Sequence, residues 1–272
     1  MSVQDSQTPA TPRVLPILEI AKDAYQLLFR HPGLFLAAMA VPLVIELLAT
    51  WAFWTTYGPE MARLATAGGG DLAQPGAFLL RLFLLLLVLL IAYSLFAVAW
   101  HRLSLLDQRP GLLPAVHGRH VRFILMTYGV SLLIGIIAFL VILPLGLLKV
   151  QSQIVFLLLG LGLVLIFMRW QLAFPAIAVD RPLGLGGAWR ATRGHTLRLF
   201  WLFLLVVIPP SAVRWLVDKL FEEQVGMFMV TGTLTPPAFA GLAISAIVGY
   251  VMLALLIGAL SGAYRHLVLQ RS

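Results

Sequence analysis

Three charged residues, Glu46, Arg81 and Arg214, lie within long apolar stretches of the sequence. A charge inside a membrane is costly unless it is paired or functional. Glu46 and Arg214 each follow a proline by four residues, at Pro42 and Pro210. Proline removes a helical hydrogen bond and kinks the helix, and the freed carbonyls can line a polar cavity. The pattern predicts an intramembrane polar site in which Glu46 pairs with Arg214 or Arg81. The alternative is that both arginines simply extend to the interface.

No catalytic motif accompanies these charges. The sequence has no HExxH, Walker A or G-x-S-x-G pattern. It has no cysteine, which excludes disulfides, thiolate metal sites and cysteine nucleophiles. No base is evident for the serines of the apolar stretches, Ser94, Ser131, Ser211 and Ser245. We therefore expect a protein that is not an enzyme, and an intramembrane enzyme is the most distant alternative.

Two further patterns could bind a ligand but have simpler interpretations. His117 and His120 have a spacing that places both on one helical face, yet a metal site needs more ligands than two. The glycines at 184–187 lack the preceding strand and the spacing of a phosphate-binding loop. We interpret the histidines as interfacial anchors and the glycines as a flexible turn. Neither a metal nor a cofactor is expected.

The composition identifies the class of protein. Hydrophobic residues make up 61% of the 272 residues, charged residues 11%, and mean hydropathy is +0.97. A soluble core of this size could not bury so much apolar surface, so lipid must cover much of it. The sequence predicts an all-α polytopic membrane protein.

Six apolar stretches are long enough to cross a membrane, for which about 20 residues are needed. The predicted spans are 34–55, 78–101, 123–147, 153–174, 199–216 and 239–264. They form a single membrane domain over 32–272. We expect helix kinks at Pro42 in the first span and at Pro209 and Pro210 in the fifth.

The residues before the first span divide into two parts. Residues 1–13 are polar and rich in proline, which predicts a disordered tail. Residues 14–31 have one apolar and one charged helical face, typical of an amphipathic helix in the membrane interface. The alternative is a helix packed against other segments of the chain.

The distribution of the basic residues predicts the orientation of the chain in the membrane. If the N-terminus is cytoplasmic, most of the 19 lysines and arginines fall on the cytoplasmic side, as the positive-inside rule requires. This distribution explains the formal net charge of +8 without a nucleic-acid partner. Both termini are then cytoplasmic. Only three of these residues are lysine, which is typical of a GC-rich bacterial genome. The expected location is a bacterial inner membrane. Tryptophans expected at the interfaces are Trp51, Trp54 and Trp215 outside, and Trp100, Trp170 and Trp201 inside.

A histidine precedes each odd-numbered span, at His31, His120 and His195. The spacing suggests three helical hairpins, each led by a basic interfacial segment. The third such segment, 169–198, is the most elaborate, and we expect it to bind anionic lipid headgroups. The residues assigned to this contact are Arg169, Trp189, Arg190, Arg193 and Arg198.

The sixth span carries small residues at intervals of four: Gly241, Ser245 and Gly249, then Ala254, Gly258 and Gly262. Small residues at this spacing let helices approach closely. We expect packing within the bundle, and the alternative is contact with a second copy of the chain.

One part of the sequence resembles a known family. Its pattern is Arg169, Pro175, Asp180, Gly-Ala-Trp-Arg at 187–190 and Thr-Arg-Gly-His at 192–195, with Arg-His-Pro at 30–32. The chain resembles a broad group of bacterial six-helix membrane proteins, whose best-named relative is the membrane domain of some glycerophosphoryl diester phosphodiesterases. The catalytic domain of those enzymes is a separate soluble barrel. The resemblance therefore implies a fold and a location, and no hydrolase activity.

Two functions follow from these patterns. The first is a non-enzymatic membrane component, such as a scaffold or accessory protein in envelope or lipid processes, with membrane lipids and a membrane protein as partners. The alternative is a transporter or permease for a small molecule or lipid, with its polar site near Glu46.

Overall fold

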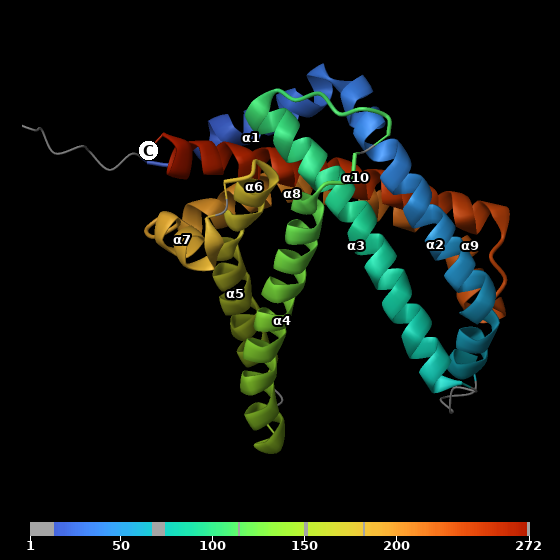
Figure 1. Ribbon diagram of the computed structural model, residues 1–272. Helices are drawn as coiled ribbons and strands as arrows, with labels where there is room; N and C mark the ends of the chain where they lie inside the picture. Colours follow the sequence, from blue (N-terminus) through green and yellow to red (C-terminus); the bar gives the residue numbers. More distant parts are fainter. Residues whose placement is uncertain (1–13, 67–73, 114, 150–151, 182, 271–272) are drawn as a thin grey trace, which may run out of the picture.

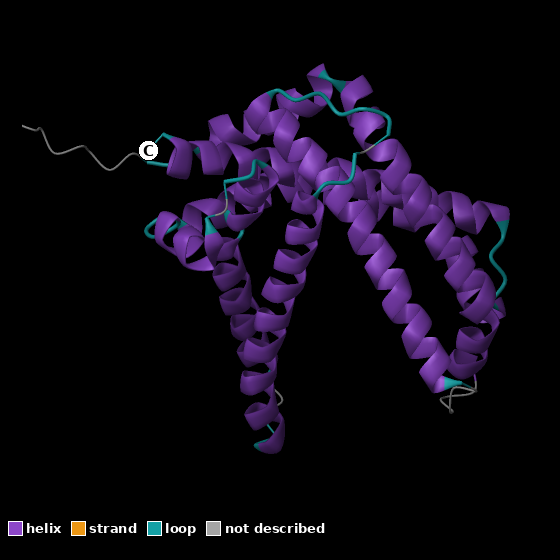
Figure 2. Cartoon of the chain, viewed as in Figure 1, coloured by secondary structure: helices purple, strands orange, loops and turns teal. Residues whose placement is uncertain are grey.

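A computed structural model describes residues 14–66, 74–113, 115–149, 152–181 and 183–270. Within these residues the chain is helical, without strands, and six helices are long and apolar enough to cross a membrane (Figure 2). The long helices are α2 (Pro32–Thr66), α3 (Pro75–Leu106), α4 (Gly118–Leu147), α5 (Gln153–Trp170), α8 (Thr196–Leu220) and α10 (Pro236–Tyr264). The all-α, six-helix prediction is confirmed. The predicted tail, 1–13, lies outside the described residues.

Five short helices accompany the long ones: α1 (Ile17–Arg30), α6 (Ala173–Ala178), α7 (Gly184–Ala191), α9 (Glu222–Thr231) and the π-helix η1 (Arg265–Leu269). The predicted turn at 184–187 is wrong, because these glycines begin α7 and only Gly184 has a positive φ, of 67°. The fourth span divides at Gln171 into α5 and α6. Helix α2 runs on through Pro42, and α8 runs on through Pro209 and Pro210.

The long helices form three groups in space (Figure 1). Helices α8 and α10 pack along each other, with α1 against both. The α2–α3 hairpin packs on α10, whereas the α4–α5 hairpin diverges from the other helices (Figure 1). Only 6% of the most apolar window is buried in the spans Gly118–Leu147 and Gln153–Ala178, against 33% in Pro75–Leu106 and Pro236–Leu269. The α4–α5 hairpin is therefore covered by lipid or by another protein.

An aromatic cluster forms the core where α2, α3 and α10 meet. The ring of Phe96 stacks with Trp100 at 5.9 Å and meets Tyr250 edge-on at 5.1 Å, and Phe35 meets both Phe96 and Trp100 edge-on. Trp100 is fully buried, and its indole N–H donates to the Ala254 carbonyl at 2.9 Å. Trp100 is thus a core residue, and its prediction as an interfacial marker is wrong.

Helix α1 packs on protein through its apolar face. Ile20 and Ala24 are buried, and they lie opposite glycines of α10. A Cβ added at Gly262 would lie 2.7 Å from Ile20 Cγ2, and one at Gly258 would lie 3.1 Å from Ala24 Cβ. The guanidinium of Arg198 holds the preceding backbone by donating to the Leu15 carbonyl at 3.2 Å. Helices α10 and α8 thus cover the apolar face that was assigned to lipid, as in the alternative of a helix packed against other segments of the chain.

The small residues of α10 serve contacts within the chain. Gly258 and Gly262 receive α1, as described above. A Cβ added at Gly241 would lie 2.7 Å from the Phe221 side chain, and one at Gly249 would lie 3.8 Å from Arg214 Nη1. The Ser245 hydroxyl donates a hydrogen bond to Asp218 of α8. These contacts agree with the prediction of packing within the bundle.

Candidate functional site

Helices α2, α3, α8 and α10 surround a cavity of ≈ 260 Å³, which we call the Glu46 cavity. Its polar lining residues are Glu46, Thr50, Tyr93, Arg214, Ser245 and Tyr250. Glu46 and Thr50 share one face of α2, since they are four residues apart. The side chain of Arg214 is 48% exposed, so the cavity reaches the molecular surface beside the C-terminal part of α8.

Glu46 and Tyr250 line this cavity together with Arg214. The Tyr250 hydroxyl and the positive charge of Arg214 both act electrostatically on the Glu46 carboxyl. Within the described residues no ion pair joins Glu46 to a basic side chain. Glu46 and Arg214 therefore share one cavity, but their charged groups do not form the predicted ion pair.

The acidic partner of Arg214 is Asp218, one helical turn further along α8. Arg214 Nε lies 3.9 Å from Asp218 Oδ2, and the Ser245 hydroxyl donates to Asp218 Oδ1 at 2.6 Å. Asp218 was not among the predicted site residues, although its i,i+4 spacing from Arg214 places both on one helix face. Tyr250 was not predicted either, because a tyrosine is an ordinary residue of an apolar helix when only charge is considered.

Arg81 lies elsewhere. Its Cζ sits 5.5 Å from the centre of the Tyr57 ring, a cation–π contact. Arg81 lines a separate cavity of ≈ 300 Å³ between α2 and α3. The structure does not bring Arg81 to Glu46.

A second polar cluster lies where α3, α4 and α6 meet. Asp180, in the left-handed region with φ 58°, binds arginines from two helices. Its Oδ2 lies 3.2 Å from Arg102 Nη1 and 3.5 Å from Arg119 Nη2. Arg102 also donates to Gln108 Oε1 at 2.6 Å and to the Ala178 carbonyl at 2.9 Å. The positive-inside rule assigns Arg102 and Arg119 to the cytoplasmic side. Nothing in the sequence indicated that both would bind the same carboxylate.

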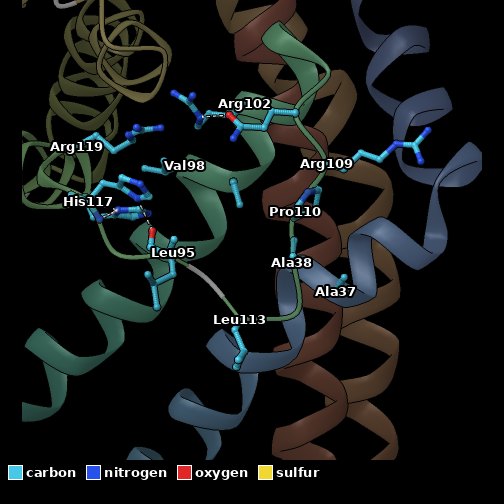
Figure 3. A pocket seen from close by; sticks show the side chains of 15 residues that line it. Ala37, Ala38, Leu95, Val98, Arg102, Arg109, Pro110, Leu113, His117 and Arg119 are labelled. Carbon is cyan, nitrogen blue, oxygen red and sulfur yellow. Dashed lines mark hydrogen bonds between the residues drawn. The ribbon is translucent and has the colours of Figure 1, made fainter.

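The cavity beside this cluster has a volume of ≈ 170 Å³. Figure 3 shows His117 and Arg119 on one side of it and Arg109 on the other. The side chain of His117 and that of His120 form a reciprocal cap at the start of α4, with His117 N donating to His120 Nδ1 at 3.0 Å. Among the described residues no group of three or more His, Cys, Asp or Glu could hold a metal ion. The spacing of His117 and His120 allows the two side chains to cap α4.

The five proposed headgroup contacts have different surroundings. The Arg169 guanidinium lies 3.6 Å from the centre of the Trp189 ring and donates to the Trp189 carbonyl at 2.7 Å. Arg198 binds Leu15, as described above. Arg190 and Arg193 are exposed. Arg169 and Trp189 thus hold α5 against α7, which leaves Arg190 and Arg193 with the freest side chains of the five.

The three histidines of the suggested repeat are not equivalent. His31 is exposed, His120 is buried and His195 is half-buried. A short helix precedes the first and third histidine, α1 and α7, whereas the described residues between α3 and α4 contain none.

No family model, curated protein or solved structure matches the chain.

Proposed function

We propose that this chain is a membrane-embedded protein that binds a small polar or amphipathic ligand in the Glu46 cavity, as a transporter or permease does. The observation that carries the proposal is a carboxylate within an apolar helix, lining a cavity with no direct ion-pair partner among the described residues. Ionisable residues are retained inside membranes mainly where they serve a ligand or ion pathway. This geometry favours the permease over the scaffold that the sequence placed first.

The helices around the cavity suggest how a ligand would pass. The cavity opens beside Arg214. The stacked and edge-on rings of Phe35, Phe96 and Trp100 fill the same helix group closer to the start of α2 and the end of α3. Tyr250 contacts both the cavity and Phe96. Passage across the membrane would therefore require the aromatic cluster to separate, and Tyr250 would couple that motion to the ligand.

The membrane and its orientation belong to the same proposal. The concentration of basic residues on one side of the predicted spans supports a bacterial inner membrane with both termini cytoplasmic. In that orientation the Glu46 cavity opens toward the outside. The family resemblance supports this location and adds no activity.

Native mass spectrometry from mild detergent tests ligand binding. We expect the wild-type chain to retain a small molecule or lipid that Glu46→Gln loses. Glu223→Gln is the matched control, because Glu223 is an exposed residue of α9 outside the cavity. The proposal fails if all three proteins retain the same set of molecules in the same amounts.

The α4–α5 hairpin favours a second function, that of a scaffold or accessory component. Its spans are only 6% buried, so an apolar surface is free for a membrane protein partner. A scaffold's partner binding would be insensitive to Glu46→Gln, whereas a permease's flux would be abolished. Measuring both properties in the same variant separates the two functions.

A further inference from the structure

The Glu46 cavity contains opposite charges that do not meet. Glu46 and Arg214 both line it, yet they form no direct ion pair. The neutral hydroxyl of Tyr250 also lines the cavity. The ion pair of Arg214 with Asp218 is long, at 3.9 Å, and Asp218 is also bound by Ser245. A positive and a negative site therefore remain available within one small space.

A charge that is partly removed from water is stable only when an opposite charge or several hydrogen bonds compensate it. A ligand that carries both charges would compensate Glu46 and Arg214 at once. A simple anion would meet Arg214 but would be repelled by Glu46 and Asp218. A simple cation would meet Glu46 but would be repelled by Arg214. The arrangement of charges thus favours a ligand with separated positive and negative groups.

We propose that the Glu46 cavity recognises a zwitterion, with its ammonium group at Glu46 and its phosphate or carboxylate group at Arg214. This inference rests on the proposed ligand-binding function. Arginine suits the second role because its planar guanidinium binds phosphate and carboxylate through two parallel hydrogen bonds. The guanidinium lies beside Gly249 of α10, since a Cβ added there would lie 3.8 Å from Arg214 Nη1, at ordinary contact distance.

The apolar part of the cavity fits a hydrocarbon portion. Leu47, Leu89, Leu242 and Leu253 line the cavity together with the polar groups. The zwitterion can therefore belong to a phospholipid headgroup, with the chains along these leucines, or to a free small molecule. Both sources present the same ammonium and anionic groups, and the experiment below separates them.

The test uses the full chain in a nonionic maltoside detergent, which carries neither charge, with three probes. Phosphatidylethanolamine carries an ammonium and a phosphate group, phosphatidylglycerol carries the phosphate alone, and free phosphoethanolamine lacks the lipid chains. We expect the wild-type chain to prefer phosphatidylethanolamine to phosphatidylglycerol. Glu46→Gln and Arg214→Gln should each weaken binding of phosphatidylethanolamine by about tenfold, the effect of one charge-assisted hydrogen bond. Binding of free phosphoethanolamine with the same sensitivity would assign the zwitterion to a soluble source.

Three controls make the result specific. Arg81→Gln removes an arginine that lines a different cavity, and Glu223→Gln removes an exposed carboxylate. Both should bind the probes as the wild type does. Arg214→Lys keeps the charge and should retain the preference for phosphatidylethanolamine, which covers the case in which Arg214→Gln does not fold.

The effect of Arg214→Gln decides between ligand classes. If it strengthens binding of a long-chain amine and leaves phosphatidylethanolamine unchanged, the site binds a cation and the zwitterion inference is overturned. If the cavity retains a different molecule that depends on Glu46 but not on Arg214, the inference fails and the proposed function stands. If no molecule depends on Glu46, both fail.

Discussion

The carboxylate of Asp180 lies 3.2 Å from the guanidinium of Arg102, and its Oδ2 lies 3.5 Å from Arg119. Asp180 follows α6, Arg102 is near the end of α3 and Arg119 begins α4. One acidic side chain therefore joins the base of the diverging α4–α5 hairpin to the helices that form the Glu46 cavity. The side chains of both arginines are only 17% exposed.

We predict that Asp180→Asn loosens this junction. Asparagine tolerates the left-handed backbone conformation at this position, so the change removes the charge and little else. The loss of two partly exposed ion pairs should lower the free energy of unfolding by about 1 kcal/mol, after allowance for solvent screening. Thermal unfolding in detergent measures the effect.

Asp107→Asn is the control for this prediction. Asp107 also has a positive φ, of 52°, and is exposed, and its side chain has no hydrogen bond or ion pair among the described residues. It should unfold as the wild type does. Equal stability of the two variants would show that the Asp180 ion pairs add nothing to the fold.

We predict that Arg169→Lys loosens α7. Lysine cannot reproduce both the flat stacking on Trp189 and the directed hydrogen bond to its carbonyl. The loss of about 1 kcal/mol corresponds to roughly fivefold more frequent opening of the contact. Hydrogen exchange of the α7 amides measures this opening. Arg193→Lys, at an exposed position, should leave the exchange unchanged, and equal exchange in both variants would refute the prediction.

We predict that Gly262→Leu displaces α1 from α10. A Cβ at Gly262 would already lie 2.7 Å from Ile20 Cγ2, and overpacking of this kind costs about 1–3 kcal/mol. Gly160→Leu in α5 is the matched control, because an added Cβ there meets nothing within 4 Å and gains the same helix propensity. Limited proteolysis and hydrogen exchange should show a less protected α1 in Gly262→Leu alone. Equal protection in both variants would mean that the glycine is not needed for the approach.

We predict that Glu46 and Tyr250 are energetically coupled. In a double-mutant cycle, Glu46→Gln and Tyr250→Phe should depart from additivity by about 1 kcal/mol, since the carboxyl and the hydroxyl line one cavity and act on each other there. A second cycle, of Glu46→Gln with Arg81→Gln, should be additive within about 0.5 kcal/mol because the residues line different cavities. Chemical unfolding in detergent provides the free energies. Additivity in both cycles would show that Glu46 and Tyr250 are not energetically coupled.

The positions of the spanning helices were predictable because a run of about 20 apolar residues has few alternatives to crossing a membrane. Their ends were less so. Helix α2 continues to Thr66, beyond the predicted end at 55, and α9 was not predicted. Polar and small residues can continue a helix as well as end it, so hydropathy alone does not mark the end.

The candidate site was predictable in part for a similar reason. The cost of a charge in an apolar helix singled out Glu46 and Arg214, and the structure places both in one cavity. The same criterion could not exclude Arg81 from the site, because the depth of a charge in the membrane does not determine which way its helix face points. Asp218 and Tyr250 were missed, since each is ordinary in its own segment and acquires a role only through the packing of α8 and α10.

The contact between α1 and α10 also joins the beginning of the described chain to its end. During synthesis α1 leaves the ribosome before the other described helices, and the helix that meets Ile20 and Ala24 is the last long one to follow. Until α10 has inserted, Ile20 and Ala24 lack the glycines that they pack against in the finished protein. The last long helix therefore acts as the closing step of assembly, and a nascent chain halted before α10 would expose the same apolar face that the finished protein hides.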